Sequence, residues 1–535
     1  MHDTTGSSHD ESEPGTTGIT RRTIVRGAAW SVPVIAAATA VPLASASTTC
    51  SLAGLQPLYV IRPSSATISF DLQLTGAGAG RTVSLSVAPA PDDTTGGGGG
   101  ETGGNADATP PAIVPGPSVT TGADGRFSFQ VVGQGEAGRG DFVLTIDAGT
   151  CGSYTTLIHI IDPATNNLRF WGYGGYGNIG DGTYQSRYIP TSPAFPSSMV
   201  FTDVAGSYLT SFAVRSDGTL YAWGWNGYQQ FGTATPGLSN TPVEVPLPSG
   251  VRIARVLDTP YVTSLAIGTD GRLYSWGYNG YGATGQSGAT VGVNVPVAPV
   301  TGLSNVTDAA GSAFGGVAID GGVVKTWGYN ASGQIGNGPA GAAYYTTPTE
   351  VTYFANNGIE VVDVAASTYA HYAVSADGDL YSWGYDGFGA LGNGTGDGGA
   401  NVYTPTPIPK VDGKNYVKVW ANYYTVFALL DDGSLVAWGH SEWGKLGNGS
   451  LTGITYSPVP AFQGVTGVVD VAISNYGSYV RTASGDVYFA GYAGSGQSGN
   501  GGVGGYYTTP VKVFREDAAT DIGATYWGAG EVLAS

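Results

Sequence analysis

The sequence predicts an all-β protein, a seven-bladed β-propeller preceded by a small immunoglobulin-like β-sandwich. First, a Trp-Gly motif and its variants recur seven times, at intervals of 51 to 56 residues. Second, each interval holds alternating runs rich in Val, Tyr, Trp and Thr, separated by Gly, Asp and Pro, with no helical period. Third, the C-terminal residues match the strands that the first repeat lacks. About fifty residues hold about four strands, which is one propeller blade.

The repeat is clearest in LYSWGYNGYG at 273–282 and LYSWGYDGFG at 380–389. A glycine follows the tryptophan position in all seven copies, and a second glycine lies nine residues beyond it. Such glycines indicate positive φ or close backbone approach, so we expect a packed turn where neighbouring blades meet. The repeat-structure residues are Trp171, Trp223, Trp276, Trp327, Trp383 and Trp438, with Ala490 in the seventh copy.

One repeat, at 352–394, gives the expected blade. A strand ends near Thr352, and strands at 361–367, 372–376 and 380–384 follow it. Asp377-Gly378 predicts a tight type I′ hairpin, in which both central residues have positive φ. One carboxylate per turn supplies too few oxygens for calcium. Equivalent turns occur at Asp217-Gly218, Asp270-Gly271, Asp320-Gly321, Asp432-Gly433 and Ser484-Gly485.

The two ends of the propeller are expected to share a blade. The first copy, NNLRFWG at 166–172, lacks the strands that precede Trp-Gly elsewhere, and TDIGATYWGAGEVLA at 520–534 matches those strands at 362–374. We therefore expect the last strands to complete the first blade, which closes the ring and leaves no open sheet edge.

The pattern VDVAAS…AVSADGDLYSWGYDGFGALGNG at 362–394 resembles the repeat of the regulator of chromosome condensation family. The resemblance covers residues 166–535 and implies a seven-bladed propeller. This sequence departs from the family pattern at Ala490 and Gln229, and the histidine usual after one turn is present only as His371. The chain also looks like the secreted bacterial β-lactamase-inhibitory propellers, which carry this fold.

Residues 1–46 have the pattern of a twin-arginine signal peptide: Arg21-Arg22, an apolar run from Ala28 to Leu43, and Ala44-Ser45-Ala46 before the cleavage point. The alternative, a membrane anchor, needs about twenty apolar residues. This run has sixteen and contains two prolines. We expect a secreted or cell-surface protein with no integral membrane segment after cleavage. The guanine-nucleotide exchange known in the family does not suit an exported chain.

Residues 47–165 are predicted to form the sandwich, with strands at 67–74, 82–89, 125–132, 141–147 and 155–162. A Gly-rich loop at 92–111 interrupts them and cannot bury apolar surface. Cys50 and Cys151 lie near the two ends of this segment, and in an exported protein they indicate a structural disulfide. Two buried thiols are the alternative.

Composition and motifs disfavour three classes of function: nucleic-acid binding, metal or cofactor binding, and catalysis. The net charge is −18 with 11% charged residues and no Lys/Arg cluster, which disfavours nucleic acid. The five histidines lack metal spacing, so no metal or cofactor is predicted. His371 and His440 are interpreted as turn histidines, and Glu360, Asp363 and Asp386 as solvated strand ends. We predict no enzyme, although carboxylates of different blades could meet at the propeller axis.

Aromatic residues mark one face of the predicted propeller. The turn that follows the strand aligned with 361–367 carries an aromatic residue in every blade, and turn tips have little interior to fill. The connections after Trp-Gly add a second, outer set, which we expect to pack partly between blades. The predicted binding face comprises Tyr208, Tyr261, Phe314, Tyr369, Tyr423, Tyr424, Tyr476 and Trp527. The outer set includes Tyr173, Tyr176, Trp225, Tyr228, Tyr278, Tyr281, Tyr329, Tyr385, Phe388, Trp443 and Tyr492.

Exposed Tyr and Trp give large contact areas at low entropic cost. The sequence therefore favours an exported, monomeric binding protein that recognises an extracellular protein, with inhibition of that protein as one form. The alternatives are a cell-wall or other carbohydrate-binding protein, whose rings stack on sugar faces, and a propeller lyase or hydrolase.

Overall fold

The computed structural model describes residues 51–534 apart from 54, 56–57, 62–66, 76–79, 90–110, 133–139, 161–165, 196–198, 234–236, 340, 395–400, 452, 503 and 514–517. The predicted signal peptide, Cys50 and all but one residue of the predicted Gly-rich loop lie outside the described residues. The twin-arginine signal, the disulfide and that loop therefore stay predictions. No helix among the described residues is long and apolar enough to cross a membrane.

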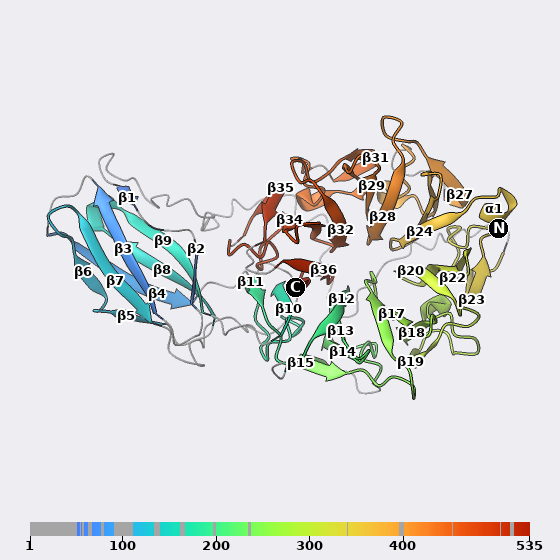
Figure 1. Cartoon of the computed structure of the whole chain (residues 1–535), viewed down its shortest axis with the longest axis horizontal. Coiled ribbons are helices and arrows are strands. Elements are labelled where there is room, and N and C mark those ends of the chain that lie inside the picture. Colours follow the sequence, from blue (N-terminus) through green and yellow to red (C-terminus); the bar gives the residue numbers. More distant parts are fainter. Residues whose placement is uncertain are drawn as a thin grey trace, which may run out of the picture.

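The N-terminal segment forms two facing sheets, with strand orders β1-β3-β7-β5 and β2-β9-β8-β4-β6 (Figure 1). Phe70, Phe129, Leu85 and Ile146 belong to the core between them. All five predicted strands are present, and the immunoglobulin-like assignment remains a prediction. Cys151 is fully buried. The strands are β1 (Ser51–Ala53), β2 (Leu58–Ile61), β3 (Thr67–Thr75), β4 (Thr82–Pro89), β5 (Ala112–Val114), β6 (Ser118–Thr120), β7 (Arg126–Val132), β8 (Gly140–Asp147) and β9 (Ser153–Ile160).

The rest of the chain forms a propeller of seven four-stranded antiparallel sheets (Figure 1). Blade 1 contains β36, β37, β10 and β11. Blades 2 to 7 follow in chain order as β12–β15, β16–β19, β20–β23, β24–β27, β28–β31 and β32–β35. The first strand named in each blade lies nearest the axis and contacts its counterparts in the neighbouring blades. The prediction of a seven-bladed all-β propeller is confirmed.

The propeller strands and their one described α-helix have these bounds. Blade 1 has β36 (Ala519–Ala524), β37 (Gly530–Ala534), β10 (Leu168–Gly172) and β11 (Arg187–Thr191). Blades 2 to 4 have β12 (Phe201–Ser207), β13 (Thr210–Arg215), β14 (Leu220–Trp225), β15 (Leu238–Glu244), β16 (Ile253–Leu257), β17 (Thr263–Gly268), β18 (Leu273–Tyr278), β19 (Asn294–Pro299), β20 (Val306–Ser312), β21 (Gly315–Asp320), β22 (Val323–Tyr329) and β23 (Tyr344–Glu350), followed by α1 (Thr352–Asn356). Blades 5 to 7 have β24 (Val361–Ala366), β25 (Ala370–Ser375), β26 (Leu380–Gly384), β27 (Val402–Ile408), β28 (Tyr416–Asn422), β29 (Thr425–Leu430), β30 (Leu435–His440), β31 (Ile454–Pro460), β32 (Val468–Ile473), β33 (Gly477–Thr482), β34 (Val487–Tyr492) and β35 (Tyr506–Lys512).

The ring closes as the sequence predicts. Strand β37 pairs antiparallel with β10, with Leu533 opposite Leu168 and Gly530 opposite Trp171. The backbone N–H of Ala534 donates to the carbonyl of Asn167 at 2.7 Å. Residues from both ends of the propeller segment therefore build one sheet, in which β10 and β37 pair with each other and neither leaves that edge open.

Two details of the predicted blade are wrong. The strand that ends before Thr352 is β23, and it pairs with β22, so it is the outer strand of blade 4 and not the first strand of blade 5. The Asp-Gly turns of blades 2, 3, 5 and 6 are not type I′; in Asp377-Gly378 of the predicted blade, Gly378 has positive φ (79°) and Asp377 does not. In blade 2, Gly218 N–H donates to Arg215 O, Arg215 N–H donates to Thr219 O, and of the turn residues Gly218 has positive φ (83°). This is a type I turn with a glycine bulge.

The Asp side chains explain the choice of turn. The Asp217 carboxylate accepts the backbone N–H of Thr219, and Asp270 and Asp432 do the same for Arg272 and Ser434. This local hydrogen bond favours a conformation in which the Asp residue has an ordinary negative φ and only the glycine has a positive φ.

The six motif tryptophans join neighbouring blades. Each is fully buried, and each indole N–H donates to a backbone carbonyl of the preceding blade, as Trp327 does to Ala283 O at 2.8 Å. The second glycine of the motif packs against the next tryptophan: a Cβ on Gly392 would lie 2.6 Å from Trp438 Nε1. The predicted glycine turn between blades is confirmed. In blade 7, Ala490 replaces the indole and Phe462 packs beside Gly447.

Candidate functional site

The two ends of the propeller differ in charge. One end carries the Asp-Gly turns, where Lys325 pairs with Asp320, Lys414 with Asp432 and Lys512 with Asp486. The other end carries the turn between the first and second strands of each blade and the connection between the third and fourth. We call this end the aromatic face. The charged side chains described in these turns and connections are Asp181, Asp258, Asp386, Glu442 and Lys445, with Arg187 beside them at the start of β11.

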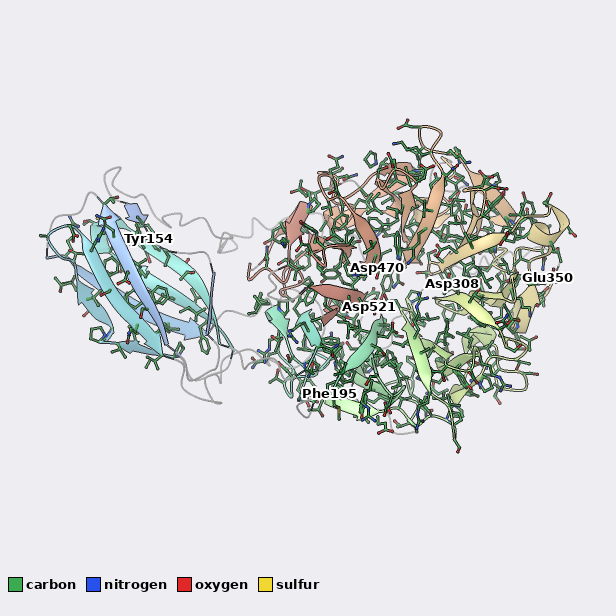
Figure 2. All side chains as sticks on the ribbon, in the orientation of Figure 1. Tyr154, Phe195, Asp308, Glu350, Asp470 and Asp521 are labelled. Carbon is green, nitrogen blue, oxygen red and sulfur yellow. The ribbon has the colours of Figure 1, made fainter. Side chains whose placement is uncertain are left out.

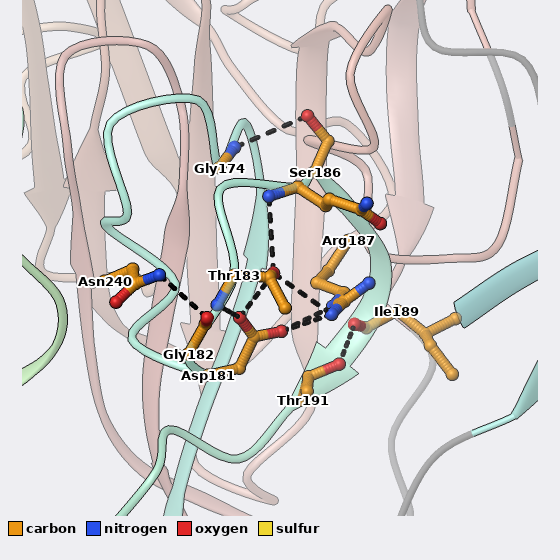
Figure 3. Close-up of polar contacts among 10 residues, drawn as sticks. Gly174, Asp181, Gly182, Thr183, Ser186, Arg187, Ile189, Thr191 and Asn240 are labelled. Atoms are coloured by element: carbon orange, nitrogen blue, oxygen red, sulfur yellow. Dashed lines mark hydrogen bonds and ion pairs between the residues drawn. The ribbon is translucent and has the colours of Figure 1, made fainter. Parts of the chain in front are cut away.

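Most of these charges are hidden. The side chains of Asp181 and Arg187 are 7% and 10% exposed, and they form an ion pair at 2.5 Å (Figure 3). Asp181 also accepts the hydroxyl and the backbone N–H of Thr183, which holds the blade 1 connection in place. Asp386 and Lys445 are buried and Asp258 is partly buried, so among the described residues of the aromatic face Glu442 is the charged side chain that is more than half exposed.

An arc of rings runs around this face. Tyr261, Phe314, Tyr369 and Tyr424 come from four successive blades, with centroids 5.2, 6.1 and 6.3 Å apart. Tyr208 continues the arc at one end, 5.8 Å from Tyr261. All five side chains are partly exposed. The rings brace one another, which the sequence reasoning did not foresee for turn tips.

Tyr476 and Trp527 form a second part of the predicted face. Their rings lie parallel, 5.1 Å apart, across blades 7 and 1. Trp443 extends this group outward, 5.9 Å from Tyr476, and stacks on Tyr506 at 5.6 Å with 16° between the planes.

Tyr423 differs from the prediction of an exposed binding residue, since it is only 4% exposed. It directly follows the innermost strand of blade 6, as Tyr208 does in blade 2, and the rings of both residues lie beside Tyr526 of the blade 1 turn. Its φ of 50° places the side chain there. Burial raises the pKa of the Tyr423 hydroxyl well above its usual range.

The outer aromatic set is more exposed than the sequence suggested. Tyr281 and Tyr385 are 40% and 38% exposed. Tyr344 and Tyr506, at 41% and 51%, were missed because they begin the outer strands and lie outside the Trp-Gly motif. Their register could have indicated them, since Tyr344 pairs with Tyr329 and Tyr506 with Tyr492.

The propeller axis is lined by charged residues at one position of the innermost strands. Figure 2 shows Asp308, Asp470 and Asp521 around the centre of the ring. Arg255 interacts electrostatically with carboxylates of four other blades, so these side chains share one space. The seven residues are Asp203, Arg255, Asp308, Asp363, Lys418, Asp470 and Asp521.

These carboxylates have a structural role. Asp203 accepts the backbone N–H of Val256 at 2.6 Å, and Asp363 accepts that of Val419 at 2.8 Å, each in the next blade. Burial raises the pKa of Asp363 to about 7. The interpretation of Asp363 and Asp386 as solvated strand ends is therefore wrong: Asp363 faces the axis, and Asp386 is buried and accepts the N–H of Leu391.

Two further polar groups are buried. His371 lies in β25, where Nδ1 contacts Gln334 O at 2.9 Å and burial lowers its pKa to about 4. Lys445 is fully buried, its Nζ 3.0 Å from His440 Nδ1, and burial lowers its pKa to about 7. No group of three metal-ligating side chains occurs among the described residues.

Comparisons with known proteins agree with this architecture. The regulator of chromosome condensation (RCC1) repeat matches residues 217–257, 270–319, 322–374 and 377–429, and a second description of that repeat matches 201–230. The human E3 ubiquitin-protein ligase HERC2 is 27% identical over 337 residues, which are 62% of this chain but 7% of that protein. The mitochondrial RCC1 domain-containing protein RUG3 of Arabidopsis thaliana is 26% identical over 66% of this chain and 83% of its own.

Among solved structures, human WBSCR16 superposes with a TM-score of 0.60 at 20% identity, covering 69% of this chain and 98% of that one. Yeast RCC1 (Prp20), solved with Kap60, gives 0.59 at 18% identity over 69% and 89%. At this identity the likeness concerns the fold. The matched repeats show that residues 201–429 contain regulator of chromosome condensation (RCC1) repeats, and the solved structures show the same propeller fold.

Proposed function

We propose that this chain is an exported recognition protein that binds another protein through the aromatic face. The observation that carries the proposal is the combination of aromatic rings from all seven blades with only one charged side chain that is more than half exposed, Glu442, among the described residues of that face. Propellers of the RCC1 type mediate protein interactions, which supports the same class of function.

The chemistry of the face suits protein recognition. Tyr, Trp, Ser, Gly and Asn dominate its turns, the composition of antibody paratopes. The rings are braced against their neighbours, so little side-chain entropy is lost on binding. Tyr424, for example, packs on Phe388 at 4.6 Å and on Tyr369 at 6.3 Å.

The sequence at 20–46 supports export through the twin-arginine route, which would place the partner outside the cytoplasm. The resemblance to secreted inhibitory propellers favours an exported enzyme as that partner. In this form of the proposal, the aromatic face covers the active site of the partner enzyme and carries out no reaction itself.

Affinity capture tests the proposal. The chain from Ser47 is immobilised and exposed to the medium and envelope of the source cells, beside the double variant Tyr424→Ala/Trp443→Ala. We expect one predominant partner protein, lost with the double variant and kept with Arg272→Ala, whose half-exposed side chain lies at the charged end. Equal capture by the double variant, with unchanged melting temperature, would exclude the aromatic face as the binding surface.

Carbohydrate binding is the second candidate, and one observation favours it. Trp443 and Tyr506 stack at 16°, and Tyr506 is 51% exposed, which gives a flat apolar surface of the kind that sugars stack on. Retention on isolated cell-wall glycan that is lost in Tyr506→Ala would support it. If the unaltered chain is not retained on the glycan, carbohydrate binding is excluded as the function of this surface.

A further inference from the structure

Three residues beneath the aromatic face differ from their equivalents in the other blades. Glu531 lies opposite Phe170 in the β37–β10 pair, Asp258 follows β16, and Gly523 lies in β36. The register of the sheets gives their equivalents. Those of Glu531 are Phe212, Leu265, Val317, Tyr372, Phe427 and Tyr479. Those of Asp258 are Gly206, Gly311, Ala366, Ala421, Ile473 and Ala524, and those of Gly523 are Ala205, Leu257, Ala310, Ala365, Trp420 and Ala472.

The three departures meet at one place. A Cβ built on Gly523 would lie 3.1 Å from Glu531 Oε2 and 3.4 Å from Asp258 Oδ1. The missing side chain of Gly523 therefore makes room for two carboxyl groups from blades 1 and 3. Asp258 accepts the backbone N–H of Gly206 at 2.6 Å and keeps part of its surface exposed.

Glu531 is not satisfied by the fold. It is fully buried, its Oε1 accepts the hydroxyl of Ser211 at 2.6 Å, and its Oε2 has no hydrogen-bond partner among the described residues. A buried oxygen without a partner costs about 1 to 3 kcal/mol, and more when it is charged. Six blades fold with an uncharged residue at this position, four of them with an apolar one, so the propeller does not require the carboxyl.

Tyr423 completes the cluster from blade 6. Its hydroxyl is buried without a described hydrogen-bond partner, and it interacts electrostatically with Asp258. The inner strands run from the charged end toward the aromatic face. The cluster therefore lies at the aromatic end of the axis, and Asp203, Asp308, Asp363, Asp470 and Asp521 lie nearer the charged end. Their negative charge exceeds that of Arg255 and Lys418 and favours a cation along the axis.

We propose that Glu531, Asp258 and Tyr423 bind a primary ammonium group. Such a group has three N–H donors, and the cluster offers three acceptors: Glu531 Oε2, the Asp258 carboxylate and the Tyr423 oxygen. Calcium would need six to eight oxygens, and a quaternary ammonium group has no N–H to donate. The ammonium can belong to a small free amine or to a lysine side chain. The site lies beneath the aromatic face and does not depend on the proposed function.

Calorimetric titration at pH 8 tests the site with ethylammonium chloride, tetramethylammonium chloride and calcium chloride at equal ionic strength. We expect ethylammonium to bind and to raise the melting temperature, and the other two not to. Glu531→Leu, which restores the residue type of Leu265, should fold and lose binding. Tyr423→Phe should weaken binding roughly 3- to 10-fold, the effect of one hydrogen bond, and Arg272→Ala, at the charged end, should change nothing.

Two otherwise identical peptides, one with a free lysine side chain and one with that side chain acetylated, distinguish a polypeptide lysine from a small free amine as the ligand. Binding of the free-lysine peptide alone, without ethylammonium, assigns the site to a polypeptide lysine. The proposal is overturned if neither amine binds, if tetramethylammonium or calcium binds equally well, or if a folded Glu531→Leu variant binds as the unaltered chain does. If the chain captures no partner protein through the aromatic face but still binds the amine, the proposed function is contradicted and the ammonium site is not.

Discussion

Replacing Trp327 by phenylalanine is expected to destabilise the propeller by about 2 to 5 kcal/mol. The indole is fully buried, and its N–H donates to Ala283 O of the preceding blade at 2.8 Å. Phenylalanine keeps one ring but leaves that carbonyl without its donor, which costs about 1 to 3 kcal/mol. The lost volume leaves a cavity between blades that adds about 1 to 2 kcal/mol.

A second substitution separates packing from backbone strain. Gly285 has φ +64°, and a Cβ on it would lie 3.1 Å from Trp327 Cδ1 and 2.8 Å from Val300 Cγ1. Gly285→Ala should therefore destabilise the chain when made alone, and by less in the Trp327→Phe background, where the contact with the indole is reduced and that with Val300 remains. The coupling free energy should exceed about 0.5 kcal/mol.

The assay is denaturant unfolding followed by circular dichroism, with midpoints compared at constant m. Tyr344→Ala, at a 41% exposed position, is the control and should change the free energy of unfolding by less than about 0.5 kcal/mol. If the two substitutions are additive, or if Trp327→Phe costs less than about 1 kcal/mol, the account of the motif as a joint between blades is refuted.

Three further outcomes are expected. Burial raises the pKa of Asp258 to about 8, so between about pH 4 and 8 the folded chain keeps a proton that the unfolded chain has released. The free energy of unfolding should therefore fall as the pH rises through this range, by up to about 1.4 kcal/mol per pH unit. Asp258→Asn should flatten the slope of melting temperature against pH, and an unchanged slope would contradict this prediction. Burial lowers the pKa of Lys445 to about 7, so its ammonium destabilises the fold most below that pH; Lys445→Gln should raise the melting temperature more at pH 6 than at pH 10, and equal gains would contradict the account. If Cys50 and Cys151 are bridged, reduction should destabilise the N-terminal sheets by up to about 4 to 5 kcal/mol, and free-thiol titration of the unfolded, unreduced chain should find none.

The repetition within the sequence made most of the fold predictable. Seven copies of one motif specify seven blades, and the match of 520–534 to 362–374 specifies the closure. The blade boundary was not predictable because the outer strands, such as Tyr344–Glu350, are rich in Thr and Pro and lie half-exposed at the rim. Their sequence carries no alternation that assigns them to one neighbour or the other.

The candidate sites were predictable in part, for a physical reason. An aromatic residue at each turn could be read from the sequence, but burial of Tyr423 depends on a positive φ and on rings from blades 1 and 2. The cluster around Glu531 is the reverse case, since it consists of departures from the repeat. Aligning the seven copies with one another would have revealed a carboxylate in an otherwise uncharged column.

The shared blade has a consequence for how the chain folds. Asn167 and Ala534 hydrogen-bond although 367 residues separate them in the sequence. Contacts between residues so far apart in the sequence form late, because the entropic cost of closing a long loop comes before the stabilising contacts are made. Blades 2 to 7 can form in order during synthesis, whereas blade 1 must wait for its own C-terminal half. Until then the edges of β10 and β37 remain available to pair with another chain, so misassembly is most expected at this last step.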